Sequence, residues 1–449
     1  MSKKISIGAA LALALLMVAA SIPLTMLFAQ NMQNRIIADL PRRVEQFQAL
    51  EEIRAIVQSE FYRTTNEDHI TMEMVSGYIT GLDDDMSRYL SAEQHQAFLQ
   101  RIAGQQPELG FELRYDPNPD NVAEQEMIEG IRYDGLVVTH VRMDSPAQRA
   151  GLRNGDRIIR AETITTVVYD QDELTPHNAA EHIARIANIG VVGGGDDETE
   201  ALDSVSVTIT FTRDREAMPP VSVMIGDSVP SIATELMAAA TENDDDEPEY
   251  TVGYIRVFAF YRNTPRQLER AIRELHDIGA TSFIIDLRGT TDGTIEYAAE
   301  SVNLLVPHVP GESIATIHFR GDRSPESFPP SATDIFWMAD DGMAILINQF
   351  TAGPAELFAY TLSAFHSADV VLVGRATRGI NTVQRAFPLS SVGGAALISV
   401  GTVVPVGGNA DWNTNGVQPT PQGGNLVYNQ NNEASQLQGA INHLTLGED

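Results

Sequence analysis

The spacing of apolar residues divides the chain into stretches with different periods. Residues 42–62, 70–82 and 92–102 have apolar positions about every third or fourth residue, set among charged and amide side chains. This period is typical of amphipathic helices. The run Asp83-Asp84-Asp85 interrupts it and predicts a solvated turn. We therefore expect a helical region over residues 32–104.

Residues 105–216 change to short alternating apolar runs, such as 136–141 and 205–211, which are typical of half-buried strands. Two short helical patterns, at 146–150 and 176–187, lie between them. This stretch is predicted to be a small β domain with inserted helices. Residues 217–250 lack such a pattern and contain an acidic run at 242–247, so we expect an acidic connector.

From residue 251 to residue 449, continuous apolar runs alternate with helical patterns. Strands are expected at 251–260, 282–287, 343–348 and 370–373, with helices at 265–278, 295–305 and 354–364. Buried strands in this order predict a layered α/β domain with a largely parallel sheet. The fold class is therefore an α/β multidomain chain.

The N-terminal 31 residues have a different character. Residues 5–29 are uncharged and mostly apolar, and Lys3 and Lys4 precede them. A run of this length can span a bilayer, and the flanking lysines favour a cytoplasmic N-terminus with the rest of the chain outside. A cleaved signal peptide is the alternative. We favour an uncleaved anchor, because Leu27 is large where a cleavage site usually has a small residue.

The amino-acid composition excludes several classes of partner and catalytic group. The net charge of −31 opposes binding to nucleic acid. The absence of cysteine excludes disulfides and thiolate catalysis, and no cofactor or metal is expected. Lys3 and Lys4 are the only lysines, so no residue from Ile5 onward can act as a lysine base.

Two motifs resemble PDZ domains of bacterial proteases. Glu108-Leu109-Gly110-Phe111 is similar to the carboxylate-binding loop of these domains, and residues 145–158, SPAQRAGLRNGDRI, are similar to their S-P-A-x-x-A-G-L-x-x-G-D-x-I stretch. The resemblance implies that residues 105–216 receive a polypeptide C-terminus by strand addition, with the N–H groups of Leu109, Gly110 and Phe111 holding its carboxylate.

Further motifs resemble the C-terminal processing, or tail-specific, serine peptidases. They are GLDDDMSRYLS at 81–91, DLRGTTDG at 286–293, NQFTAGPAELF at 348–358 and GRATRGINTVQ at 374–384. The resemblance covers nearly everything after residue 31 and implies a peptidase-like core over 251–449. That family uses a serine nucleophile and a lysine base.

The matched positions lack this chemistry. The nucleophile falls at Gly353, the oxyanion positions fall at Pro354 and Asp292, and the base falls at Ile380. Proline has no N–H to donate, and isoleucine cannot titrate. A catalytically degenerate member is therefore the leading interpretation.

Three functions remain open from the sequence. The first is a pseudo-peptidase that binds polypeptide C-termini or unfolded extracytoplasmic proteins. The second is an active endopeptidase with a relocated nucleophile, for which Thr351 is the candidate. The third is a structural scaffold of the cell envelope.

Overall fold

The computed structural model describes residues 47–105, 109–116, 135–163, 167–175, 177–187, 206–225, 230–238, 251–306, 313–330, 342–405 and 412–446. The chain divides into two compact units, Met1–Val75 and Ser76–Asp449. A helix covers residues 47–60 in the first unit. Helix α2 (Glu67–Thr80) crosses the boundary, and α3 (Ala92–Ile102) belongs to the second unit. These helices lie where the apolar spacing predicts them.

Helix α3 begins at a capping box. Ser91 accepts a hydrogen bond from the N–H of Gln94, and the Gln94 side chain accepts one from the N–H of Ser91. Both N–H groups would otherwise lack a partner at the helix start. The short strand β1 (Arg88–Leu90), which the apolar spacing did not indicate, immediately precedes this box.

The predicted membrane anchor, residues 5–29, lies outside the described residues. Within the described ranges, no helix combines the length and the apolar character needed to cross a membrane.

The predicted β domain is built on a seven-stranded sheet of the described residues. Its strands run in the order β2-β3-β4-β6-β7, with β5 beside β4 and β8 beside β6. The bounds are β2 (Phe111–Asp116), β3 (Gly135–Val141), β4 (Arg157–Glu162), β5 (Val167–Asp170), β6 (Ser206–Arg213), β7 (Glu216–Ala217) and β8 (Val221–Met224). Helices α4 (Pro146–Arg149) and α5 (Ala179–Ala187) and the 3₁₀ turn η2 (Gln171–Glu173) complete this region.

Strand β2 is an edge of that sheet. Among the described residues it pairs only with β3, antiparallel, and α5 contacts it. Its outer edge therefore carries backbone groups that the sheet itself does not use.

A second sheet forms the centre of the α/β region, in the order β17-β16-β12-β10-β9. Strands β10 (Val252–Val257), β12 (Ser282–Asp286), β16 (Met343–Ile347) and β17 (Val370–Gly374) are mutually parallel, as the sequence predicts. Each of the first three is buried along its whole length. The short strands β11 (Ala259–Phe260) and β13 (Asp292–Gly293) pair separately.

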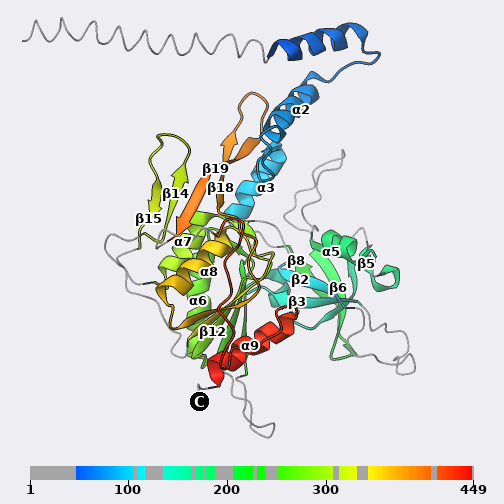
Figure 1. Cartoon of the computed structure of the whole chain (residues 1–449). Helices are drawn as coiled ribbons and strands as arrows, with labels where there is room; N and C mark the ends of the chain where they lie inside the picture. The colour runs from blue at the N-terminus through cyan, green and yellow to red at the C-terminus, as the bar shows by residue number, and fades with distance from the viewer. Residues whose placement is uncertain are drawn as a thin grey trace, which may run out of the picture. The chain divides into compact units, whose positions relative to one another are not determined.

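Helices cover both faces of this sheet. Helices α6 (Thr264–Asp277), α7 (Ile295–Asn303) and α8 (Pro354–Phe365) pack on one face, where Figure 1 shows them together. Helix α9 (Glu433–Thr445) packs on the other face against Tyr254, Ile284 and Leu346. Alternate residues of each strand thus enter two separate cores, which explains their continuous apolar sequence.

The region expected to be a connector, 217–250, contains ordered strands, which corrects that expectation. Strand β8 belongs to the seven-stranded sheet, and β9 (Ile232–Met237) pairs antiparallel with β10 at the edge of the central sheet. Ile232 and Ala233 are buried there. The pairing of β9 with β10 is a tertiary contact that the pattern of residues 232–237 alone does not indicate. The acidic run 242–247 lies outside the described residues.

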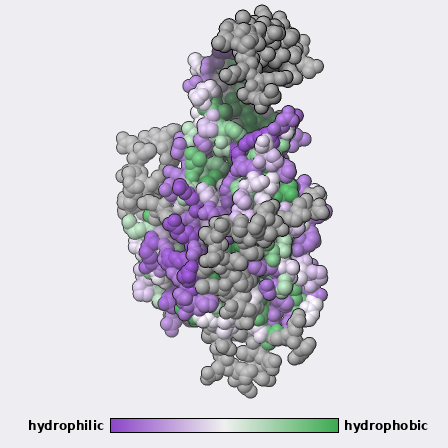
Figure 2. All heavy atoms as spheres, turned by 90° about the vertical axis from the view of Figure 1, so that its left-hand side faces the viewer, coloured by the Kyte–Doolittle hydropathy of each residue, from purple (hydrophilic) through white to green (hydrophobic). Residues whose placement is uncertain are grey.

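A third sheet is absent from the sequence-based prediction. It joins β1, β14 (Ala315–Phe319), β15 (Glu326–Phe328), β18 (Thr382–Pro388) and β19 (Ala395–Pro405). Strand β1 pairs with β19 although Arg88 and its partner Leu397 lie far apart in the sequence. On the face drawn in Figure 2, hydrophilic side chains cover much of the described surface, as the chain's charge leads one to expect.

Candidate functional site

Three loops meet at the carboxyl edge of the central parallel sheet. They follow β12, which ends at Asp286, β16, which ends at Ile347, and β17, which ends at Gly374. These strands are neighbours in the order β17-β16-β12. Loops at this edge are the usual position of ligand and active sites in α/β sheets. All positions matched to peptidase catalysis lie on these loops or directly after them.

Backbone and amide hydrogen bonds lock the first two loops together. The N–H of Gly289 donates to Asn348 Oδ1 at 3.0 Å, and the N–H of Ala352 donates to the carbonyl of Thr290 at 3.0 Å. The third loop joins them through the N–H of Arg378, which donates to the carbonyl of Thr351 at 2.9 Å. The loops therefore form one frame.

The carboxylate of Glu356 completes this frame. Its Oε2 accepts the N–H groups of Gly353 and Ile380, each at 2.8 Å. Its Oε1 accepts the N–H of Gly379 at 2.7 Å and the hydroxyl of Thr377. Glu356 is fully buried. Burial raises the pKa of its carboxyl, although the four donors favour the charged form.

Gly353 and Ile380, the nucleophile and base positions, are thus brought together by one carboxylate. The loop after β17 thus reaches the start of α8. Glu356 was not among the site residues predicted from the sequence. An acidic residue in the first turn of an otherwise apolar helix, Pro354–Phe365, is the feature that could have indicated it.

The backbone at Gly353 keeps an unusual conformation, with φ of 58° and ψ of −112°. This region strongly favours glycine. A Cβ atom at this position would meet no atom within 4 Å. The space beside the nucleophile position is therefore open, while the residue that fills the position has no side chain to place there.

Pro354 begins helix α8 directly after Gly353. Proline suits the first helical position because its N–H would have no helical partner. Proline also has no N–H with which to stabilise an oxyanion. The helix start is therefore well formed around a residue that cannot donate from its backbone.

Asp292 lies in β13, which pairs with β11. Its half-exposed carboxylate is 3.6 Å from Arg101 Nη1 and 3.4 Å from the hydroxyl of Tyr261. Arg101 therefore offsets part of the negative charge of this carboxylate.

Thr351 is the candidate nucleophile from the sequence, but its hydroxyl has a structural role. It is fully buried. Its hydroxyl donates to the carbonyl of Leu287 at 2.8 Å and accepts the N–H of Asn348 at 3.0 Å. A nucleophile needs a base to take its proton and open access to substrate. This geometry argues against Thr351 as a relocated nucleophile.

Leu109, Gly110 and Phe111 lie at the start of edge strand β2. Gly110 has a φ of 85°, and its carbonyl accepts the N–H of Arg142 at 2.9 Å. The carbonyl of Leu109 accepts the N–H of Ala147 at 3.0 Å. Among the described residues, the N–H groups of Leu109 and Gly110 meet no acceptor. Both carbonyls are thus used internally, whereas neither N–H group has a backbone acceptor among the described residues.

A charged network connects this sheet to the central sheet. Buried Asp286 accepts the hydroxyl of Tyr254 at 2.8 Å and the Arg288 guanidinium at 2.6 Å, and Arg256 donates to its carbonyl at 3.0 Å. Burial would raise the pKa of Asp286, but Arg288 and Arg256 hold it below its ordinary value. His140, on β3, has its Nε2 3.2 Å from the Tyr254 hydroxyl.

Burial also raises the pKa of Tyr254 well above its ordinary value, with Asp286 adding to the effect. Tyr254 therefore stays a neutral donor. Among the described residues, no group of three or more His, Asp or Glu side chains has a geometry that could hold a metal ion.

Comparison with known proteins identifies similar sequences. Residues 251–422 match the sequence profile of Peptidase family S41. The carboxyl-terminal-processing protease of Synechocystis sp. is 24% identical over 327 residues, which cover 73% of this chain and 65% of the relative. The carboxy-terminal processing protease CtpA of Bacillus subtilis is 24% identical over 330 residues, which cover 74% and 59% respectively. The chain thus spans less than two thirds of the length of these relatives.

Solved structures give matches of low identity. The photosystem II D1 C-terminal processing protease is 20% identical, with 88% of this chain and 90% of that chain covered and a TM-score of 0.42. A putative S41 protease from Bacteroides fragilis is 16% identical, with 77% and 82% covered and a TM-score of 0.48.

The Asp286 network generates a prediction about stability. Asp286→Asn removes the carboxylate that the Arg288 guanidinium contacts directly and whose charge the buried Arg256 faces, so we expect the free energy of unfolding at neutral pH to fall by about 3–5 kcal/mol. A carboxyl whose pKa is lower in the folded than in the unfolded protein stabilises the fold at pH values above its unfolded-state pKa. That contribution is lost as the pH falls through its folded-state pKa. The deficit should therefore shrink under acid conditions.

Chemical denaturation of both proteins, followed by circular dichroism from neutral pH to about pH 3, measures this. Asp322→Asn, at an exposed position, is the control. If the loss of stability caused by Asp286→Asn stays constant across this pH range, the lowered pKa of Asp286 is contradicted.

Glu356 generates a second prediction. Glu356→Gln keeps the shape but turns an amide NH₂ toward two of the four donors. Each buried donor left unpaired costs about 1–3 kcal/mol, so we expect the free energy of unfolding to fall by roughly 2–6 kcal/mol. Thermal or denaturant unfolding measures it, with Glu296→Gln in the first turn of α7 as a matched control. Equal stability of the two variants would show that the carboxylate does not hold the frame.

Proposed function

This chain belongs to the C-terminal processing peptidases, family S41, and from that premise we propose that it is a non-catalytic member that binds polypeptide C-termini. The observation that carries the proposal is a site whose backbone frame is complete while its reacting groups are missing. Glu356 holds Gly353 and Ile380 together, but neither offers a hydroxyl or a titratable side chain.

The absence of these reacting groups would greatly reduce the stabilisation of the transition state for peptide hydrolysis. A serine hydroxyl is a weak nucleophile until a neighbouring base accepts its proton, and both partners are absent here. Removing one oxyanion donor alone costs about 2.7–4 kcal/mol of transition-state stabilisation. Pro354 removes such a donor, and Asp292 places a carboxylate at the other donor position. Lysine cannot return from elsewhere in the chain, because Lys3 and Lys4 are the only two.

The binding half of the proposal rests on the start of β2. An extended peptide that adds to the free edge of β2 would gain main-chain hydrogen bonds. Its terminal carboxylate would lie at the N–H groups of Leu109 and Gly110. In this proposal the region 105–216 acts as a PDZ-like receptor, and its ligands are extracytoplasmic polypeptides with free C-termini. Residues 5–29 would tether the protein to the membrane.

The first experiment tests for catalysis. We expect no cleavage when the full chain, purified in detergent, is incubated with an unfolded substrate that carries a short apolar tail, and the products are examined by mass spectrometry. A serine peptidase that cuts the same substrate serves as the positive control. Cleavage by the native chain that disappears in Thr351→Ala would refute the non-catalytic assignment and support a relocated nucleophile.

The second experiment tests binding. We expect fluorescently labelled peptides with a free C-terminus to bind, and the same peptides with a C-terminal amide to bind at least about tenfold more weakly, because charge-assisted hydrogen bonds contribute about 1.5–3 kcal/mol. Fluorescence anisotropy measures both affinities.

Gly110→Ala should weaken binding of the free-acid peptide to the level of the amide. A Cβ at Gly110 would lie 2.2 Å from the Cβ of Ser145, so the loop must move. Gly155→Ala is the matched control, because Gly155 has a φ of 89° and a Cβ there meets no atom within 4 Å. If both variants bind equally well, or if free acid and amide bind alike, a scaffold that ignores the partner's C-terminus becomes the better account.

A further inference from the structure

Strand β2, whose outer edge pairs with no strand among the described residues, has two faces of different character. Its alternate apolar residues pack against the core of the seven-stranded sheet: Phe111, Leu113 and Tyr115. The residues opposite them on β3 lie in the same core: Val141, Val138 and Leu136. Side chains alternate between the two faces of a strand. The other face of β2 therefore carries three charged residues: Glu112, Arg114 and Asp116.

Two of these charges are paired within the protein. Asp116 Oδ2 accepts a hydrogen bond from Arg157 Nη2 at 3.0 Å, and both side chains are mostly buried. Glu112 Oε2 lies 3.4 Å from Nδ1 of His140, the residue opposite it on β3. Burial would raise the pKa of Glu112, but His140 and Arg256 hold it below its ordinary value. Both carboxylates are therefore engaged before a ligand arrives.

Arg114 differs from both of these residues. It is the one exposed residue of β2, and among the described residues it makes no ion pair. The residue opposite it on β3 is Val137, which offers no charge. An arginine side chain has five N–H donors and no acceptor. This face of β2 thus presents one unpaired positive charge beside the edge that would receive a peptide.

The direction of β2 fixes which peptide residue would lie opposite Arg114. A peptide whose carboxylate lies at the N–H groups of Leu109 and Gly110 must run antiparallel to β2, with its last residue opposite Phe111. Counting back along the peptide and forward along β2, the residue three positions before the last lies opposite Arg114. Residues directly opposite each other in an antiparallel pair have neighbouring side chains on the same face. That peptide side chain would therefore lie beside the free guanidinium.

We propose that Arg114 selects an acidic side chain at the third residue before the C-terminus of the captured polypeptide. A guanidinium recognises a carboxylate through paired hydrogen bonds, and opposite charges that face each other across two strands stabilise their pairing. The last-but-one peptide residue would lie opposite Glu112, whose charge His140 already uses, so no basic preference is expected there. This selection rests on the proposed binding of C-termini.

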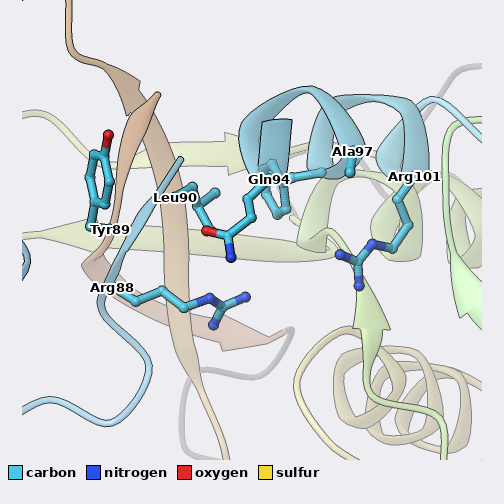
Figure 3. Close-up of a pocket in the computed structure, with 7 residues that line it drawn as sticks. Arg88, Tyr89, Leu90, Gln94, Ala97 and Arg101 are labelled. Atoms are coloured by element: carbon cyan, nitrogen blue, oxygen red, sulfur yellow. The ribbon is translucent and has the colours of Figure 1, made fainter. Parts of the chain in front are cut away.

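A second exposed arginine supplies a matched control. Arg88 on β1 is exposed, and among the described residues it makes no ion pair. Together with Arg101 it lines a pocket between β1 and α3, and Figure 3 shows the two side chains on the strand and on the helix. Strand β1 pairs with β19 and belongs to a different sheet from β2. Arg88→Gln therefore removes the same charge as Arg114→Gln without touching the receiving strand.

The test uses peptides with a free C-terminus that are neutral except for one Glu, placed at successive positions, and the matched set with Gln. With the full chain in detergent, fluorescence anisotropy should show that Glu at the third residue before the terminus binds about two- to fivefold more tightly than Gln. A cross-strand pair of opposite charges contributes up to about 1 kcal/mol, which is about fivefold. At other positions Glu should bind no more tightly than Gln, because the net charge of −31 repels an acidic ligand.

Two substitutions of Arg114 separate a direct pair from a general charge effect. Arg114→Gln should abolish the preference for Glu, whereas Arg88→Gln should retain it. Arg114→Glu should create a preference for Lys over Gln at the same peptide position, beyond any that the native chain shows there. Because Arg114 is exposed, both variants should unfold at the same temperature as the native chain, and circular dichroism checks this.

The outcomes distinguish this inference from the proposed function. Equal affinity for the Glu and Gln sets, a preference at another position, or a preference that survives Arg114→Gln would overturn the role of Arg114 while leaving the binding of C-termini intact. If no peptide with a free C-terminus binds at all, the proposed function fails, and the selection by Arg114 fails with it.

Discussion

Four hydrogen-bond donors from two loops converge on the buried carboxylate of Glu356, and the geometry of the candidate site depends on that convergence. The N–H of Gly353 comes from the loop after β16, whereas the N–H groups of Gly379 and Ile380 and the hydroxyl of Thr377 come from the loop after β17. A buried charge is tolerated only when it is well paired by hydrogen bonds. The burial that makes this carboxylate costly also makes its four donors hard to replace, so the loops have one favourable arrangement.

None of these contacts uses a catalytic side chain. The frame is held by main-chain N–H groups, one threonine and one glutamate. Gly353 suits a positive φ, Pro354 suits the first turn of α8, and Ile380 contributes its backbone N–H. Each of these three residues is therefore compatible with the frame. Because main-chain groups supply most of its contacts, the frame by itself does not establish an activity.

Much of the α/β region could be predicted from the sequence, because its strands are buried on both faces and its helices have one apolar side. Helix α6, with Leu268, Ile272 and Leu275 in the core, begins and ends within a residue of the predicted bounds. The sheet that joins β1 to β19 could not be predicted, because its strands are half-buried and the pairs β1–β19 and β14–β19 join segments far apart in the sequence. Strand β9 was missed for the same reason, since its pairing with β10 decides its structure.

The candidate site divides in a similar way. The motifs place Gly353, Pro354 and Ile380 by their order along the chain, and the count of lysines follows from composition. The role of Glu356 requires knowing that residues 377–380 fold back onto α8, which is a tertiary contact. The pocket at Arg88 and Arg101 is also tertiary, because a strand and a helix must meet before two arginines can share one space. Local patterns fix where a backbone turns, and the partners of a buried charge follow only from the complete fold.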